Sequence, residues 1–112
     1  MPQDPELTDK QSIMHARCDN WGRAMSGGYP GNGQVTSLRP EPDLLDALEI
    51  ERGMCAMRRD KKRVYRLFKF LYLGNHAIIE AALAWRKTEY WIKRNRNEGL
   101  QYLIRYFSTE SG

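Results

Sequence analysis

The strongest constraint on the fold is a run of apolar residues at helical spacing in the middle of the chain. These residues fall at positions i, i+3, i+4, i+7 and i+8, and they are Val64, Leu67, Phe68, Leu71 and Tyr72. The spacing places them on one face of an α-helix. No segment shows sustained strand alternation, and there is no internal repeat. The pattern therefore predicts a single all-α domain over 1–112, with about five helices.

The N-terminal third predicts one helix followed by a long loop. Thr8 and Gln11 have the spacing of a capping box, which satisfies two backbone amides at a helix start. A helix over about 9–24 then carries one apolar face, formed by Met14, Cys18, Trp21 and Met25. The interval 26–42 contains four glycines and three prolines, which supply turns and block a helix. It is predicted to be a loop. It lacks the strand and the Gly-Lys-Ser/Thr sequence of a phosphate-binding motif.

Capping residues divide the middle of the chain into two further helices. Asp43 is a candidate N-cap for a helix to about residue 58, in which Gly53 permits either a close helix contact or a bend. Its apolar stripe is formed by Ala47, Ile50, Met54 and Met57. Asp60 is a candidate cap for the helix that carries the central stripe. The sequence Leu73-Gly74-Asn75 suits a left-handed cap at the end of that helix.

The last third predicts two helices joined by a tight turn. Helical character restarts over His76 to Ala84, Trp85 to Thr88 form the turn, and Thr88 is the N-cap of the last helix. One side of that helix is apolar and is formed by Ile92, Gly99, Leu100, Leu103 and Phe107. The segment 76–107 is thus a predicted helix-turn-helix.

The charge is divided unevenly along the chain. Residues 1–57 hold five basic and nine acidic residues, whereas 58–112 hold thirteen basic and five acidic residues. The second half thus has a net charge of +8 and also contains Trp and Tyr. It suits a polyanion, because Lys and Arg neutralise phosphates and release counterions. The alternative is an ordinary solvated helical surface. Seven of the cations surround the central stripe, namely Arg58, Arg59, Lys61, Lys62, Arg63, Arg66 and Lys69.

Side chains on the outer face of the last helix are suited to double-stranded DNA. If Ile92, Gly99 and Leu103 face the core, a rotation of about 100° per residue turns Tyr90, Arg94, Asn97 and Gln101 outward, flanked by Trp91 and Lys93. Arg bonds guanine bidentately, Asn and Gln bond adenine, and aromatic rings meet thymine methyls or phosphates. Arg86 and Lys87 in the turn suit phosphate contacts. The predicted DNA-binding set is Arg86, Lys87, Thr88, Tyr90, Trp91, Lys93, Arg94, Asn97 and Gln101.

Enzyme, metal and membrane functions are poorly supported by the sequence. The chain has no His-x-x-x-His, no arguable Ser/His/Asp set, and no paired carboxylates in an evidently apolar cleft. Glu49 and Glu51 lie two residues apart and do not share a helix face. His15, Cys18, Cys55 and His76 are nominal zinc ligands without the usual paired spacing, so we expect no cofactor and no metal. The absence of a signal peptide, a long apolar run or a Cys-x-x-Cys pair predicts a cytoplasmic protein with reduced cysteines.

Several of these motifs together resemble the phage antitermination protein Q family, in the branch without a zinc finger. They are Asn20-Trp21-Gly22, the Asp46-Ala47-Leu48 to Met57 stripe, Leu71-Tyr72-Leu73-Gly74, and the Ala82, Trp85, Thr88, Ile92 spacing, which is similar to region 4 of sigma factors. The resemblance spans about 20–107. Arg96 departs from it, because the family pattern favours an apolar residue there: either the Arg96 stem lies along the core while its head reaches solvent, or the helix register is shifted. It implies a non-enzymatic regulator of late gene expression that binds promoter DNA, engages the bacterial RNA polymerase, and makes it read through terminators.

Two other functions remain open from the residues alone. The chain is alternatively a helix-turn-helix repressor or activator that does not travel with polymerase, or a basic adaptor that binds another protein. Salt dependence of binding separates the adaptor from the DNA-binding proteins. Transcription through a terminator separates the antiterminator from the repressor or activator.

Overall fold

The computed structural model describes residues 5–26 and 41–110, and these residues form a helical domain. The elements are α1 (Asp9–Met25), α2 (Leu44–Asp60), α3 (Lys62–Phe68), a π-helical turn η2 (Lys69–Leu73), α4 (Ile78–Trp85) and α5 (Glu89–Glu110). The described ranges contain no strand, so the predicted all-α class is confirmed. Most of the loop predicted over 26–42 lies outside the described residues.

Helices α1 and α2 begin at the predicted caps. The Thr8 hydroxyl accepts the Gln11 amide at 3.1 Å, and the Gln11 side chain accepts the Thr8 amide at 3.0 Å. The Asp43 carboxylate accepts the Asp46 amide at 3.1 Å. The Asn20 side chain exchanges two hydrogen bonds of 2.8 Å with the Asp43 backbone. This pair fixes the start of α2 against α1.

The junction between α2 and α3 differs from the prediction at one residue. Asp60 does not cap α3; it is the last residue of α2, and its carboxylate accepts the Tyr102 hydroxyl at 2.7 Å. Helix α3 begins after Lys61 without a side-chain cap. The Asp60 carboxylate thus bonds to a residue of α5 instead of capping α3. All five residues of the central stripe are buried, as predicted.

The end of the third helix differs from the prediction. It widens into the π-turn η2, and the left-handed residue that follows is Asn75, with φ 55°, rather than Gly74, with φ −77°. Asn tolerates this conformation better than most residues. Gly74 is needed for a different reason: a Cβ there would lie 2.8 Å from the Phe70 carbonyl oxygen.

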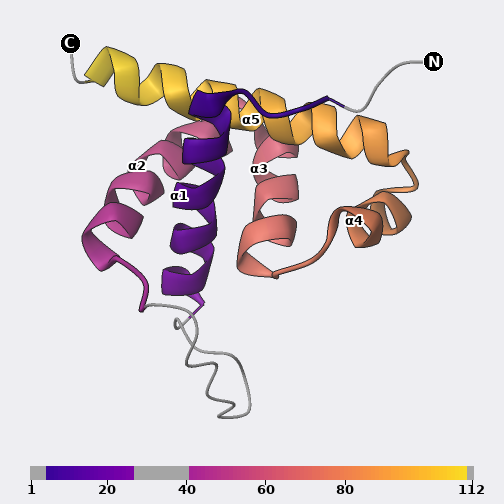
Figure 1. Cartoon of the computed structure of the whole chain (residues 1–112), viewed down its shortest axis with the longest axis horizontal. Helices are drawn as coiled ribbons and strands as arrows, with labels where there is room; N and C mark the ends of the chain where they lie inside the picture. Colours follow the sequence, from indigo (N-terminus) through magenta and orange to yellow (C-terminus); the bar gives the residue numbers. More distant parts are fainter. Residues whose placement is uncertain (1–4, 27–40, 111–112) are drawn as a thin grey trace.

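Helix α5 is the element on which the other helices meet. Helices α1, α2, α3 and α4 all pack against it, and Figure 1 shows them gathered on one side of its axis. Its core residues Ile92, Leu100 and Leu103 are fully buried. Gly53 and Gly99 permit close packing, because a Cβ would lie 2.8 Å from Leu103 Cδ2 and 2.5 Å from Phe68 Cε1, respectively. Within the described residues, no helix packs on the opposite side of α5.

None of the helices in the described ranges combines the length and the apolar character that crossing a membrane requires.

Candidate nucleic-acid interface

The turn between α4 and α5 is a compact three-residue connection. The Lys87 amide donates to the Ala82 carbonyl at 3.0 Å and the Arg86 amide donates to the Leu83 carbonyl at 3.3 Å, which is the pattern of a Schellman motif. Arg86 occupies the left-handed position, with φ 56° and ψ 46°. The Thr88 hydroxyl then accepts the Trp91 amide at 3.0 Å and caps α5, as predicted. Two helices and a short turn are thus present.

This turn exposes two cations in front of α5. Arg86, Lys87 and Thr88 are all exposed, although the Thr88 hydroxyl is already engaged in the cap. The Lys87 ammonium lies 5.2 Å from the centre of the Trp91 ring. Backbone geometry therefore holds Arg86 and Lys87 exposed at the start of α5.

Trp91 is partly buried, and two cations lie over its ring. Its ring packs partly buried against the core cluster, and the Arg63 guanidinium lies 5.6 Å from its centre on the side of α3. Two cations, Arg63 and Lys87, thus share one aromatic ring. Cation–π contacts of this kind are worth about 0.5–1 kcal/mol at exposed sites. Trp91 links the basic surface of α3 to the turn.

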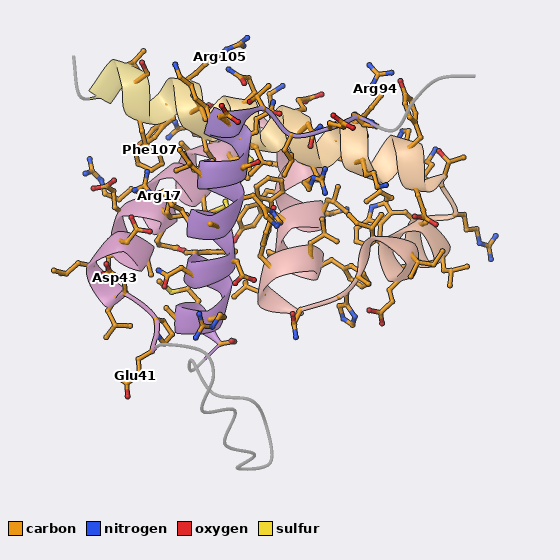
Figure 2. All side chains as sticks on the ribbon, viewed as in Figure 1. Arg17, Glu41, Asp43, Arg94, Arg105 and Phe107 are labelled. Carbon is orange, nitrogen blue, oxygen red and sulfur yellow. The ribbon has the colours of Figure 1, made fainter. Side chains whose placement is uncertain are left out.

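The outward face of α5 is open at Arg94. Figure 2 shows the side chains of Arg94 and Arg105 directed away from the other helices, and both residues are exposed. The Arg94 guanidinium lies 5.9 Å from the centre of the Tyr90 ring, one turn earlier. Tyr90 and Lys93 are half-buried. Arg94 is therefore the most accessible member of the predicted base-contacting set.

Two residues that were predicted to contact DNA, Asn97 and Gln101, form hydrogen bonds within the protein. Asn97 is half-buried, and its carbonyl oxygen accepts the Arg96 Nε–H at 3.0 Å. Gln101 is half-buried beside the start of α1, where its side-chain carbonyl oxygen accepts from the side-chain amide (Nε2) of Gln11 at 3.5 Å. The segment that precedes α1 crosses α5 in this region (Figure 1). Among the four residues predicted to face outward, Tyr90, Arg94, Asn97 and Gln101, only Arg94 is exposed.

Arg96 is explained without a shift of register, because Ile92, Leu100 and Leu103 all face the core. The side chain is half-buried, and desolvation lowers the pKa of its guanidinium. The first of the two interpretations, in which Arg96 leans along the core, fits this environment.

A second basic surface was not predicted as a site. It is a groove of about 630 Å³ between the end of α2 and the α3–η2 segment, lined by Cys55, Arg58, Arg59, Lys62, Tyr65, Arg66 and Lys69. The sequence shows that this part of the chain is rich in cations. It does not show that they share a groove, because the groove depends on the packing of α2 against α3. We call this surface the α2–α3 groove.

The described residues do not assemble a metal site. No group of three or more His, Cys, Asp and Glu side chains comes together in 5–26 and 41–110. Cys18 is buried and Cys55 is exposed. His76 stacks on Phe70, with ring centres 4.0 Å apart, and pairs with Glu80 at 3.3 Å.

Comparison of the chain with family models, with curated proteins and with solved structures found no match.

Proposed function

We propose that this protein is a DNA-binding regulator of transcription and that α4, the turn and the N-terminal part of α5 form its DNA-reading unit. One observation carries the proposal. The face of α5 opposite the core presents Arg94 to solvent, and the capped turn presents Arg86 and Lys87 beside it. A recognition helix needs one face anchored in the protein and the other face free to enter the major groove.

The positions of these residues support a division of roles. Arg94 lies one turn inside α5 and is suited to a guanine edge, to which Arg bonds bidentately. Arg86 and Lys87 precede the helix and are suited to the backbone, where they fix orientation without reading sequence. Tyr90 and Lys93 flank Arg94. Asn97 and Gln101 take a smaller part, because each already bonds to a protein neighbour.

Within this class we propose an antiterminator of phage late genes, which acts with bacterial RNA polymerase in the host cytoplasm. The support is the resemblance of 20–107 to the antitermination protein Q family.

A surface for a protein partner is also available at the start of α2, where Leu44, Leu45 and Leu48 are 63%, 82% and 58% exposed. Exposed apolar side chains that adjoin one another mark protein contacts. The start of α2 lies away from α5 (Figure 1), so DNA and polymerase are expected to bind different surfaces.

Transcription with purified polymerase tests the proposal. Templates with and without a terminator, downstream of a DNA segment selected for binding to this protein, should give increased read-through when the protein is added. Leu45→Ser should remove read-through and leave DNA binding unchanged. Sequence-specific, salt-dependent DNA binding without any read-through would instead identify a repressor or activator. DNA binding that is absent, or that does not change with salt, would identify the adaptor.

A further inference from the structure

The α2–α3 groove concentrates positive charge that the protein itself leaves largely unopposed. Five of its seven lining residues are Arg or Lys, and none is acidic. Arg59 pairs with Asp60 at 3.3 Å. In the described part of the chain Arg58, Lys62 and Arg66 have no ion pair with a carboxylate. Like charges gathered in a concave surface repel one another, and a bound anion would relieve this repulsion.

The cations are arranged along a line. Lys62, Arg66 and Lys69 follow one another at i, i+4 and i+7 on one face of α3 and η2. At about 1.5 Å per residue they extend over about 10 Å. About three stacked nucleotides occupy that length, at roughly 3.4 Å each along a strand. Arg58 and Arg59 at the end of α2 form the opposite wall. A phosphodiester chain that lies along the groove meets cations on both sides.

An aromatic ring within the groove is suited to single-stranded rather than double-stranded nucleic acid. Tyr65 is half-buried among the cations, and the Lys69 ammonium lies 5.9 Å from its ring centre. Unpaired bases stack on aromatic side chains in grooves that are lined by cations. A duplex keeps its bases paired and presents a convex surface, so it reaches the rim of such a groove without bringing a base to Tyr65.

We propose that the α2–α3 groove binds single-stranded nucleic acid, with Arg58, Lys62 and Arg66 on the backbone phosphates and Tyr65 under one base. The site lies on elements other than the DNA-reading unit, and the proposal does not rest on that function. DNA and RNA strands share this chemistry, and the 2′-hydroxyl is what distinguishes them.

Fluorescence anisotropy with labelled oligothymidylate and oligouridylate, each about 15 nucleotides long, tests the charge requirement. The double variant Lys62→Ala/Arg66→Ala should weaken binding about tenfold or more and reduce the log–log salt slope by about 1.4, at about 0.7 for each lost contact with a single strand. The matched control is Lys10→Ala/Arg105→Ala, which removes the same charge from exposed positions outside the groove. It should change affinity less than twofold. Equal losses in the two variants would overturn the proposal.

Tyr65 provides a test that does not depend on charge. Tyr65→Leu should weaken strand binding about fivefold or more, whereas Tyr65→Phe keeps the ring and should bind as the parent does. Thermal unfolding of both variants monitors folding. Comparison of the thymidylate and uridylate strands shows whether the 2′-hydroxyl contributes. Equal binding by Tyr65→Leu and Tyr65→Phe would exclude a base on this ring.

Cys55 reports directly on occupancy, because it lines the groove and the other cysteine, Cys18, is fully buried. Partial desolvation, and then the hydrogen bond to Glu51, raise the pKa of the Cys55 thiol. Labelling with a maleimide dye is therefore best followed at mildly alkaline pH. A saturating single strand should slow the labelling at least several-fold, and a duplex of equal length should not. Stronger protection by the duplex would assign the groove to double-stranded DNA and overturn the proposal. Arg94→Ala should leave the protection by the strand unchanged even if duplex binding is lost.

Discussion

The Nδ1 atom of His15 lies 2.7 Å from the hydroxyl oxygen of Tyr72, and this contact joins α1 to η2. The two rings meet edge to face, with their centres 5.5 Å apart. Burial, and then the charge of Arg96, lower the pKa of His15, while Asp19 acts in the opposite direction. His15 is therefore kept neutral in the folded protein at pH values where an exposed histidine takes up a proton.

The free energy of unfolding should consequently decrease as the pH falls below about 6.5, the ordinary pKa of histidine. In the window between the lowered folded pKa and 6.5, the unfolded chain binds more protons than the folded one, so stability rises with pH. Above pH 6.5 His15 no longer lowers the free energy of unfolding. Urea unfolding at several pH values from 5 to 8 measures it. In His15→Gln the dependence within this window should be reduced, and an unchanged dependence in that variant would assign it to other groups.

Gly22→Ala should destabilise the fold strongly. A Cβ at this position would lie 2.0 Å from the Tyr72 carbonyl oxygen, and a backbone atom cannot move away as a side chain can. Helix α1 would have to separate from η2, at a cost of about 2–3 kcal/mol in the free energy of unfolding. The matched control is Gly53→Ala, whose Cβ meets the ends of the Leu103 and Phe107 side chains. It should cost less, because those ends can shift. Chemical denaturation of both variants decides, and a smaller loss for Gly22→Ala would contradict the expectation.

Arg86→Gly should separate stability from DNA binding. Left-handed backbone costs a non-glycine residue about 1–2 kcal/mol, and glycine loses about 0.5–1 kcal/mol more chain entropy on folding. The net expectation is an increase in stability of about 0.5–1 kcal/mol together with weaker duplex binding, because a cation is lost. Asn75→Gly relieves the other left-handed residue without changing charge, and serves as the control for binding. If both variants bind DNA like the parent, Arg86 is not a phosphate contact.

Arg94→Ala and Lys87→Ala should differ in what they do to specificity. Loss of Arg94 should cost about 1–3 kcal/mol on the cognate site and little on scrambled DNA. Loss of Lys87 should weaken both nearly alike and lower the log–log salt slope by about 0.9. Titration of the two variants against cognate and scrambled duplexes provides the measurement. If Arg94→Ala lowers the affinity for the two duplexes equally, Arg94 contacts the DNA backbone and not a base.

Local sequence signals predicted the helices well, because caps and apolar stripes depend on residues three or four positions apart. Thr8, Asp43 and Thr88 all cap as predicted. The cap predicted at Asp60 was wrong, and the hydrogen bond of Gln101 to α1 was not predicted, for one shared reason. Their partners, Tyr102 and Gln11, lie 42 and 90 residues away along the chain. Local spacing carries no information about such pairs.

The candidate sites show the same limit. The phase of α5 follows from its own stripe, so the outward position of Arg94 was predictable. The α2–α3 groove combines Cys55, Arg58 and Arg59 of one helix with residues of the next. It forms because the chain turns sharply at Lys61 and α3 folds back beside α2. The cations were visible in the sequence, but their arrangement around Tyr65 was not.

The position of α5 as the common support of the other helices has a consequence for biosynthesis. Helices α1 to α4 leave the ribosome first, yet each buries part of its apolar surface against residues of α5. Until the chain through about Phe107 has left the exit tunnel, Gly53 lacks its neighbours Leu103 and Phe107, and Val64 and Phe68 lack their neighbour Gly99. The nascent chain should therefore stay dependent on chaperones or remain loosely collapsed, and consolidate in one late step once α5 is released.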